Sequence, residues 1–584
     1  MCGLTVLFSY TTINNSDLGL LHACNKEMIY RGPDEQDVWH HQNIALAHVR
    51  LSIIGVSNGH QPLFNEDNSL ALVCNGEIYN YVQLKTELSA KGHVFKTYTD
   101  AEVILHLYEE YGDRLCEKLE GMFAFALYDL KTGHLIVARD RAGKKPLYYA
   151  NTRDGIVFSS ELKIIKNYFL SEVKINYEVL RQTQQYSYSI SPEETYIKGI
   201  YKVPYASYTK LTSNTVQPHF IQYYRRNIQD TFTGTYEEAC REVKRLLYRA
   251  VEKRLQSEVP VAVLLSAGID SSAIACIASQ MTDKVHVISA GYSGKHKVDE
   301  RAEARKLSRE RGFIWDELEL NEDDFSANLN SMLSKIDEPN GDVAMFAQWE
   351  IYKHAGNKGF KVLLSGNGGD ELFYGYPSHN QYAQGLQWLK NKAGYFPIAE
   401  KRDAVKLWVQ QILKWIMNRE PYMLDKINLN MDYPVMKDFK NYLDTNHIPI
   451  YRSDWHKENF NHEIDKVYHF LHYAWLTNNC YFLADKLAMA HSVEVRCPFA
   501  DLDLINFVDS LPLGIKFKDG KPKQLLKDSL KDVLPEYVLS RSKSGFTPPY
   551  TFVEKMINGY EKKHFSEAPV TFAQLVTDYF AANV

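Results

Sequence analysis

Two patterns of hydrophobic positions divide the chain. In the first third, short apolar or alternating runs recur with few long helices between them, as at residues 4–8, 70–74 and 119–129. Such a series predicts a layered α+β domain that ends near residue 205. Farther along, buried strands such as 285–290 and 360–365 alternate with helical segments. That alternation predicts an α/β domain with a parallel, doubly wound sheet.

The clearest strand–turn–helix unit spans residues 259–280. Residues 261–265 are apolar and rich in β-branched side chains, residues 266–272 are small, and residues 271–280 have helical spacing with Asp270 or Ser271 as the cap. Small side chains let a phosphate reach the free N–H groups and positive dipole end of a helix. An ordinary strand–helix turn would look the same, so this unit alone leaves phosphate binding open.

Other small or acidic residues follow the predicted parallel strands. Residues 266–272, Ala290 and residues 365–371 all lie at strand ends, where ligands bind in doubly wound sheets. Asp270 and Asp370 are therefore expected to face each other across a nucleotide and to share Mg²⁺. Helix capping by each carboxylate is the alternative.

Composition excludes several classes of protein. The 584 residues indicate two or more domains, and the mixed net charge of −5 offers no basic face for nucleic acid. The sequence contains no run of 18 apolar residues, which a membrane-spanning helix would need. Its N-terminus lacks the basic region of a signal peptide. The eight cysteines show neither a C-x-x-C pair nor zinc-ligand spacing, which favours reduced thiols and a cytoplasmic location.

The second residue is a candidate nucleophile. Methionine before a small residue is normally removed, which would make Cys2 the mature N-terminus. Its α-amine, with a reference pKa of ~7.7–8.0, could then take the proton of its own thiol. The strand predicted at residues 4–8 would hold that nucleophile in a sheet. A second residue without a role is the alternative, and the motifs that follow argue against it.

Several short motifs accompany Cys2 in the first third of the chain. They are Arg31-Gly-Pro-Asp-Glu35, the predicted strand 45–54 with Arg50 as an exposed cation, Asn75-Gly-Glu77, Thr97-Tyr-Thr-Asp100 and residues 139–148. Together they resemble the glutaminase domain of class II amidotransferases, which have an N-terminal nucleophile. The resemblance implies an αββα fold for residues 1–205, followed by a connector at 206–235.

The same resemblance implies roles for these residues. Cys2 attacks the side-chain amide of L-glutamine to form a thioester, and Asn75 with the N–H of Gly76 stabilises the oxyanion. Arg50 binds the α-carboxylate, and Glu77 and Asp100 hold the α-ammonium. The implied glutamine-binding residues are Arg50, Leu51, Ile53, Asn75, Gly76, Glu77 and Asp100. A hairpin turn at Asn75-Gly76 and surface charges at Arg50 and Asp100 are the alternatives.

Residues 236–584 resemble the synthetase domain of glutamine-hydrolysing asparagine synthetases. The motifs that carry the resemblance are Ser266-Ala-Gly-Ile-Asp-Ser271, Asp337-Glu-Pro339, Ser365-Gly-Asn-Gly-Gly-Asp-Glu371, Asp485-Lys486 with Met489-Ala490, Glu494-Val-Arg-Cys-Pro-Phe499, Gly520-Lys-Pro-Lys523 and Lys543-Ser-Gly-Phe546. The first of these is similar to the pyrophosphate loop of enzymes that adenylate a carboxylate, with Ala267 in place of a glycine.

This second resemblance implies that ATP activates a carboxylate, L-aspartate in this family, as an acyl-adenylate. Ammonia freed at Cys2 then crosses an internal tunnel and attacks it. Lys523 neutralises developing charge as a compact cation. The implied ATP-binding residues are Leu265, Ser266, Gly268, Asp270, Ser271, Ala290, Ser365 and Gly366, with Asp270 and Asp370 as Mg²⁺ ligands. The resemblance also allows a homodimer.

One position departs from the family pattern. Asparagine synthetases usually carry glutamate where this chain has Asn367, and an amide can neither act as a base nor carry charge. The acceptor could therefore be a sugar acid or a natural-product carboxylate. Two further hypotheses are a regulatory protein with two inactive domains, which the complete Cys2 set disfavours, and an RNA-modifying adenylating enzyme, which the near-neutral charge disfavours.

Overall fold

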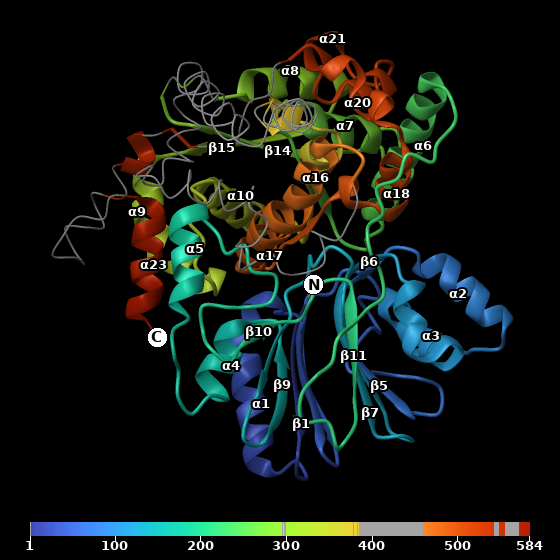
Figure 1. The fold of residues 1–584 in the computed structure, drawn as a ribbon, viewed down its shortest axis with the longest axis vertical. Coiled ribbons are helices and arrows are strands. Elements are labelled where there is room, and N and C mark those ends of the chain that lie inside the picture. Colours follow the sequence, from blue (N-terminus) through green and yellow to red (C-terminus); the bar gives the residue numbers. More distant parts are fainter. Residues whose placement is uncertain are drawn as a thin grey trace, which may run out of the picture.

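The computed structural model describes residues 2–294, 296, 299–377, 379–381, 383–384, 460–541, 548–549, 551–554, 557 and 571–583. An N-terminal domain contains two six-stranded antiparallel sheets, and a C-terminal domain is built on a five-stranded parallel sheet. Figure 1 shows the two domains one above the other, with the layered N-terminal domain below. No helix among these described residues is long and apolar enough to span a membrane.

The first antiparallel sheet has the strand order β10-β8-β9-β1-β3-β2. Its strands are β1 (Cys2–Ser9), β2 (Glu35–His41), β3 (Ile44–Arg50), β8 (Tyr148–Asn151), β9 (Gly155–Ser159) and β10 (Tyr201–Lys202). In the β1–β3 register Cys2 lies opposite Arg50. The expected strand to residue 54 is therefore too long, because β3 ends at Arg50 and residues 51–54 leave the sheet.

The second antiparallel sheet has the order β12-β11-β7-β6-β5-β4. Its strands are β4 (Leu63–Phe64), β5 (Leu70–Ile78), β6 (Gly121–Asp129), β7 (His134–Arg139), β11 (Ser207–Leu211) and β12 (Ile221–Gln222). Asn75 and Gly76 lie within β5, opposite Ala124 and Phe123, and do not form a hairpin turn. Residues 206–235 were expected to form a connector, but β11 and β12 within them extend this sheet through Gln222.

Helices cover the outer face of each sheet. Side chains such as Val6, Leu46 and Val73 fill the space between the two sheets. α1 (Asn15–Met28) and α4 (Leu162–Tyr168) pack on the first sheet, and α2 (Tyr81–Ala90) and α3 (Val103–Tyr111) pack on the second. Figure 1 shows these helix pairs on opposite sides of the strands. The expected αββα order is therefore confirmed.

The parallel sheet of the C-terminal domain has the order β15-β14-β13-β16-β17. Its strands are β13 (Val261–Leu264), β14 (His286–Tyr292), β15 (Ile314–Leu320), β16 (Val362–Leu364) and β17 (Glu494–Arg496). Alternate residues face opposite sides, so Ala262 packs toward α10 (Met345–Asn357) and Val263 toward α7 (Ile269–Ala278). The doubly wound parallel sheet is as expected, and β15 lies at one edge of it.

The other described helices complete the C-terminal domain and its contact with the first. They are α5 (Tyr177–Tyr186), α6 (Tyr236–Leu255), α8 (Arg301–Arg311), α9 (Glu322–Ile336), α11 (Gly369–Leu372), α16 (Glu463–Phe470), the π-helix Leu471–Tyr481, α17 (Phe482–Met489), α18 (Leu502–Ser510), α19 (Leu513–Lys516), α20 (Gln524–Ser529), α21 (Glu536–Leu539) and α23 (Phe572–Ala582). Short 3₁₀ turns are Ile29–Arg31, Asp100–Glu102, Gly112–Glu117, Pro498–Ala500 and Lys518–Gly520.

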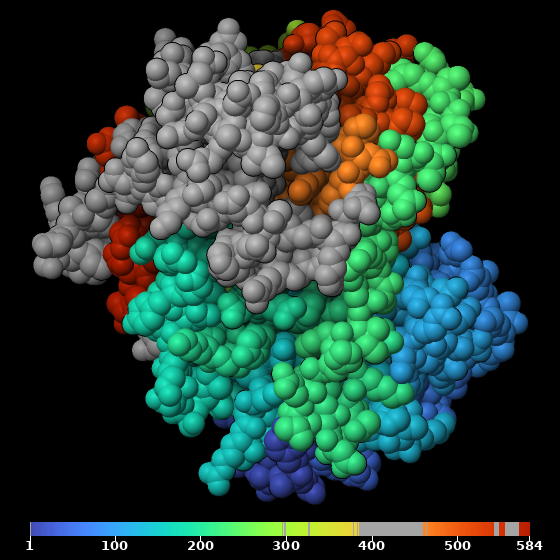
Figure 2. Space-filling view, in the orientation of Figure 1, coloured from blue at the N-terminus to red at the C-terminus, as the bar shows by residue number. Residues whose placement is uncertain are grey.

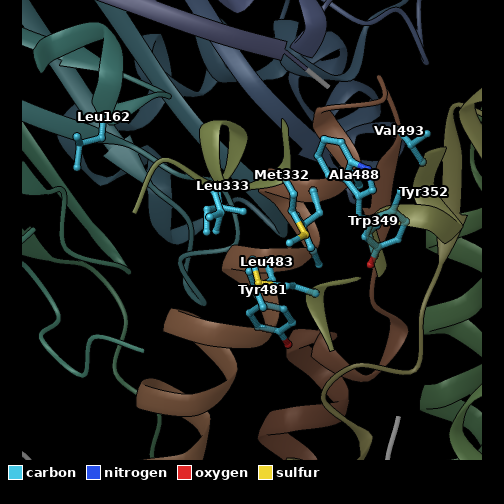
Figure 3. Packing of buried hydrophobic residues seen from close by; sticks show 14 of the residues in the cluster. Leu162, Met332, Leu333, Trp349, Tyr352, Tyr481, Leu483, Ala488 and Val493 are labelled. Atoms are coloured by element: carbon cyan, nitrogen blue, oxygen red, sulfur yellow. The ribbon is translucent and has the colours of Figure 1, made fainter. Parts of the chain in front are cut away.

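The two domains share a continuous core. Leu162 of α4 belongs to the same buried cluster as Leu333 of α9, Trp349 of α10 and Leu483 of α17. Figure 3 shows these side chains between the helices. In Figure 2 the green segment that leads to α6 lies on the surface and passes from the lower domain to the upper one. The sites of the two domains are thus held in one packed unit.

Buried charges also join the domains. Arg31 contacts Glu161 at 2.6 Å within the N-terminal domain and Asp485 of α17 at 2.8 Å. Lys486 contacts Glu161 at 2.9 Å and Asp337 at 3.2 Å. These five side chains are at most 4% exposed. The motifs at 337–339 and 485–486 therefore lie at the domain interface.

Candidate active sites

The first candidate site is built around Cys2, which begins β1 and is buried. The backbone N of Cys2 donates a hydrogen bond to Asn75 Oδ1 at 3.1 Å. The other side-chain atom, Asn75 Nδ2, is buried and has no hydrogen-bond partner among the described residues. Arg31 Nε donates to the carbonyl of Cys2 at 3.1 Å and fixes the end of the strand. Asn75 thus fixes the backbone of Cys2, the candidate nucleophile, and its two side-chain N–H groups remain without a partner among the described residues.

Burial determines the resting state of the Cys2 thiol. Burial raises its pKa, while the backbone N–H of Leu51 and the charge of Arg50 act against that shift. The thiol is therefore neutral near pH 7, and it needs a base before it can attack a carbonyl carbon. An α-amine on Cys2 itself would be that base.

Arg50 is buried rather than exposed, which corrects the expectation from its sequence. Its Nη2 donates to the carbonyls of Gly55 at 2.7 Å and Ile54 at 3.3 Å, and its Nη1 contacts Glu35 at 3.1 Å. The loop after β3 folds back over the guanidinium, so carbonyls replace the water that an exposed arginine would bind. Gly59 permits this approach, because a Cβ there would lie 2.4 Å from Nη2.

Glu77 and Asp100, the expected ammonium ligands, are both buried, and burial raises the pKa of each. Asp100 Oδ2 accepts from the N–H of Ile78 at 2.6 Å, which ties it to β5 beside Asn75 and Gly76. Glu77 Oε1 contacts Nη2 of Arg496 at 2.8 Å. Arg496 belongs to the C-terminal domain, so a predicted glutamine-binding residue lies on the interface.

Leu51 and Ile53, also expected at the glutamine site, direct apolar side chains elsewhere. Both belong to a small buried cluster with Val362 and Met489 of the C-terminal domain. The backbone of this loop lies beside Arg50, and the N–H of Leu51 reaches the Cys2 thiol. Any contact of these two residues with glutamine therefore comes from their backbone.

The second candidate site lies at the carboxyl ends of β13 and β16. Leu265 N donates to Ile288 O, and Ser266 N donates to Ser271 Oγ at 3.1 Å. Ala267 has a φ of 54°, a conformation that glycine adopts more easily. α7 begins at Ile269 with Gly268 as its N-cap, so the expected cap at Asp270 or Ser271 is wrong. The loop turns earlier than its sequence indicates, and Asp270 falls inside the first helical turn.

Lys523 joins the two acids that the sequence placed at this site. Its ammonium contacts Asp270, and it contacts Asp370 Oδ1 at 2.6 Å. Burial alone would lower the pKa of Lys523, but the two carboxylates outweigh it and the pKa is raised. The side chain of Lys523 therefore stays protonated. Asp370 lies inside α11, whose N-cap is Gly368, so neither acid is a helix cap.

Two glycines allow this close grouping. A Cβ at Gly369 would lie 2.6 Å from Asp270 Oδ1. A Cβ at Gly375 would lie 2.1 Å from Asp370 Oδ1 and 2.4 Å from Lys523 Cε. Any larger residue at either position would separate the carboxylates from the lysine.

The remaining expected ATP-binding residues lie at or near the ends of the parallel strands. Ser365 N donates to the carbonyl of Arg496 at 2.9 Å, and a Cβ at Gly366 would lie 3.0 Å from Asp270 Cβ. Ala290 lies within β14, which continues to Tyr292, so it does not end the strand as expected. Asn367 N donates to Ser365 Oγ at 3.4 Å, within the loop of the second site.

Sequence reasoning missed the residues that connect the two sites. Arg496 contacts Glu77 through its side chain and Ser365 through its carbonyl, so it touches a residue of each site. Arg496 belongs to the motif at residues 494–499, and that motif was the sequence signal that could have identified it. The motif at 543–546 lies outside the described residues.

Two family models match consecutive parts of the chain. Residues 1–224 match a glutamine amidotransferase domain, and residues 242–581 match asparagine synthase. The chain belongs to the asparagine synthase family. It is 30% identical to asparagine synthetase [glutamine-hydrolyzing] 1 of Bacillus subtilis (strain 168), over 94% of this chain and 87% of that one.

Other members of the family show a similar degree of identity. Asparagine synthetase [glutamine-hydrolyzing] 3 of the same strain is 27% identical, over 94% of this chain and 88% of its own. A putative asparagine synthetase [glutamine-hydrolyzing] of Mycobacterium tuberculosis (strain ATCC 25618 / H37Rv) is 30% identical, over 89% of this chain and 83% of its own. Membership in the asparagine synthase family makes the protein a glutamine-dependent ligase with ATP as the expected substrate.

Proposed function

We propose that this protein is a glutamine-dependent asparagine synthetase. It converts L-aspartate, L-glutamine and ATP to asparagine, glutamate, AMP and pyrophosphate. The observation that carries the proposal is Lys523, which contacts both Asp270 and Asp370 in the loops expected to bind ATP. A buried charge group at the ends of parallel strands suits activation of a carboxylate by a nucleotide.

The first half-reaction takes place at Cys2. The Cys2 thiol gives its proton to the α-amine and attacks the side-chain carbonyl carbon of glutamine. Asn75 Nδ2 and the N–H of Gly76 donate to the oxyanion, a role supported by the unused hydrogen-bonding capacity of Nδ2. The tetrahedral intermediate collapses as the C–N bond breaks, and the amine returns the proton to the departing ammonia. Water then hydrolyses the thioester to glutamate.

The second half-reaction takes place beside Lys523. The expected ATP-binding residues hold the nucleotide, and Lys523 offsets the negative charge of its phosphates. Asp270 and Asp370 fit Mg²⁺, because their carboxylates already converge on one cation. When bound, Mg²⁺ would supply further charge neutralisation on the phosphates.

Ammonia passes between the two reactions through the interior. The cluster of Leu51, Ile53, Ile54, Val362 and Met489 joins the loop beside Cys2 to β16, which leads into the ATP loop. Apolar side chains favour neutral ammonia over ammonium, because burying an unpaired ion costs far more than the roughly 2–7 kcal/mol of burying an uncharged polar group. This cluster supports the proposed path.

Asn367 favours a second candidate acceptor. Its side chain carries no charge, unlike the glutamate usual at this position of the family, and the loop is part of the proposed ATP site. An amidotransferase for a sugar acid or natural-product carboxylate would need the same glutaminase and adenylating groups. Only the acceptor pocket would differ.

Pyrophosphate release tests which acceptor is correct. Untagged protein is incubated with ATP, Mg²⁺ and ammonium chloride, with and without L-aspartate. We expect release that depends on aspartate and is matched by asparagine. Glutamine hydrolysis without any response to aspartate would overturn the first proposal, and a panel of uronic acids would then test the second.

A further inference from the structure

Two histidines and two glutamates converge in the N-terminal domain, in a cluster that neither half-reaction uses. The four are Glu66, His93, His106 and Glu109. Glu66 lies between β4 and β5, His93 follows α2, and His106 and Glu109 lie three residues apart on α3. One ligand atom from each residue lies within 4.8 Å of all the others. We propose that these residues form a site for a divalent transition-metal ion, and that Zn²⁺ fits it best.

The distances within the cluster suit tetrahedral coordination. His106 Nδ1 lies 2.9 Å from Glu109 Oε2 and 3.5 Å from Glu66 Oε2. His93 Nδ1 lies 3.3 Å from the same Glu109 oxygen and 4.0 Å from Glu66 Oε1. Bonds of ~2.0–2.1 Å to zinc place tetrahedral ligands about 3.3 Å apart. The four observed distances lie on both sides of that value, so small side-chain movements would complete the site.

Three of the four ligands are also held by a hydrogen bond on their far side. His93 Nε2 lies 3.1 Å from Glu110 Oε1. His106 Nε2 faces Glu102 Oε1 at 3.8 Å, which is beyond hydrogen-bond distance. Glu109 Oε1 accepts from Asn65 Nδ2 at 2.8 Å, and Glu66 Oε1 accepts from the N–H of Val94 at 3.3 Å. A carboxylate behind a metal-bound imidazole fixes its tautomer and raises its basicity. Both Nδ1 atoms lie beside the same oxygen, Glu109 Oε2.

Charge and burial favour a cation within this cluster. His106 is completely buried, and its ring packs against Phe95 at a centroid distance of 4.4 Å. Four carboxylates, those of Glu66, Glu102, Glu109 and Glu110, surround the two imidazoles, and Lys91 offsets Glu110. Imidazole and carboxylate ligands suit zinc. A bound ion would fasten the loop that carries His93 to α3, just before the turn that contains Asp100.

Zinc titration of the full chain tests the proposal. The background is Cys2→Ala, which removes the active-site thiol as a competing ligand. After treatment with a chelator, calorimetry should detect one tight zinc site per chain. His93→Ala and Glu66→Gln, both partly exposed positions, should each weaken it more than 100-fold. Glu110→Gln should weaken it about 10–100-fold, as removal of a group behind a ligand does.

The matched control is His40→Ala, which removes an exposed histidine of β2 outside the cluster and should leave zinc affinity unchanged. Cobalt(II) bound at the same site should give the intense visible absorption of tetrahedral coordination. The proposal is overturned if the full chain binds no stoichiometric zinc. It is equally overturned if His93→Ala and Glu66→Gln bind zinc as the parent does, because the cluster would then be an ion-pair network only.

Discussion

At the scale of single residues, the two sites use burial in opposite ways. Asn75 Nδ2 is buried without a partner among the described residues, while Lys523 is buried with two anionic partners. An unpaired buried amide costs roughly 1–3 kcal/mol, and the proposed oxyanion role would supply its missing partner during the reaction. The paired lysine instead keeps a fixed charge where phosphates are expected.

Replacing Asn75 tests its proposed contribution to the first half-reaction. Asn75→Ala should lower kcat for glutamine hydrolysis by about 10²–10³, the usual effect of removing one oxyanion donor. Ammonia-dependent asparagine formation should not change. Asn151→Ala, at the exposed end of β8, is the control for loss of an amide. Unaltered glutamine hydrolysis in Asn75→Ala would rule out the oxyanion role.

Gly375 tests the charge group of the second site. The Cβ of Gly375→Ala would overlap both Asp370 Oδ1 and Lys523 Cε, so the pair must move apart. Pyrophosphate release with ammonia should fall at least tenfold, while glutamine hydrolysis stays normal. Gly514→Ala is the control, since nothing lies within 4 Å of a Cβ there. Equal activity of the two variants would mean that the close contact is dispensable.

At the scale of elements, the short strand β17 connects the two sites. Arg496 at its end contacts Glu77 at 2.8 Å, and its carbonyl accepts from Ser365 N at 2.9 Å. The side chain also contacts Glu494 at 2.5 Å and donates to the carbonyl of Gln256 at 2.6 Å. The guanidinium of Arg496 thus contacts both Glu77 and the end of α6, and it fixes their positions relative to β17.

Arg496→Lys keeps the charge but loses the planar set of five donors, so it cannot satisfy these partners together. We expect a raised KM for glutamine, since Glu77 loses its fixed position, and a lower kcat for ammonia-dependent synthesis, since Ser365 shifts. Steady-state kinetics of both reactions measure the effect, with the exposed Arg309→Lys of α8 as control. A change confined to thermal stability would contradict this connecting role.

Elements with a strong periodic pattern were predictable from the sequence. The β-branched run at 261–265 became β13, and the apolar run at 70–74 became part of β5. β17 was not predictable as a strand, because three residues give no period. The burial of Arg50 was also missed, since its solvation comes from carbonyls of a loop whose path depends on tertiary contacts.

The residues of the two candidate sites were also predictable only in part. Motifs identified Cys2, Asn75, Asp270, Asp370 and Lys523, and the structure groups the last three and joins the first two. The motifs at Asp337 and Asp485 were quoted with the synthetase chemistry, but both residues contact the N-terminal domain. A sequence shows which charges occur, and only the fold shows which of them meet.

At the scale of the whole molecule, Glu161 is central to the buried interface. Burial alone would raise its pKa, but Lys486 and Arg31 outweigh burial and lower it. Its pKa in the folded state is thus below the unfolded value of about 4.3. The stabilisation it provides is complete above that pH and is lost as pH falls toward the folded pKa, because the unfolded chain then binds the extra proton.

Glu161→Gln should therefore lower the free energy of unfolding by about 3–5 kcal/mol at pH 7, since Arg31 and Lys486 lose a buried partner. The difference from the parent should shrink at pH 3.5. Urea unfolding at both pH values measures it, and the exposed Glu252→Gln serves as control. A difference that stays constant or grows on acidification would contradict the assigned ion pairs.

The central claim is that one chain holds two separate sites, one that frees ammonia and one that uses it. Asparagine formation by untagged Cys2→Ala, with glutamine or with ammonium chloride as the nitrogen source, tests this claim most directly. We predict no asparagine from glutamine and undiminished asparagine from ammonium chloride. Loss of both activities in a folded variant would contradict the division into two sites.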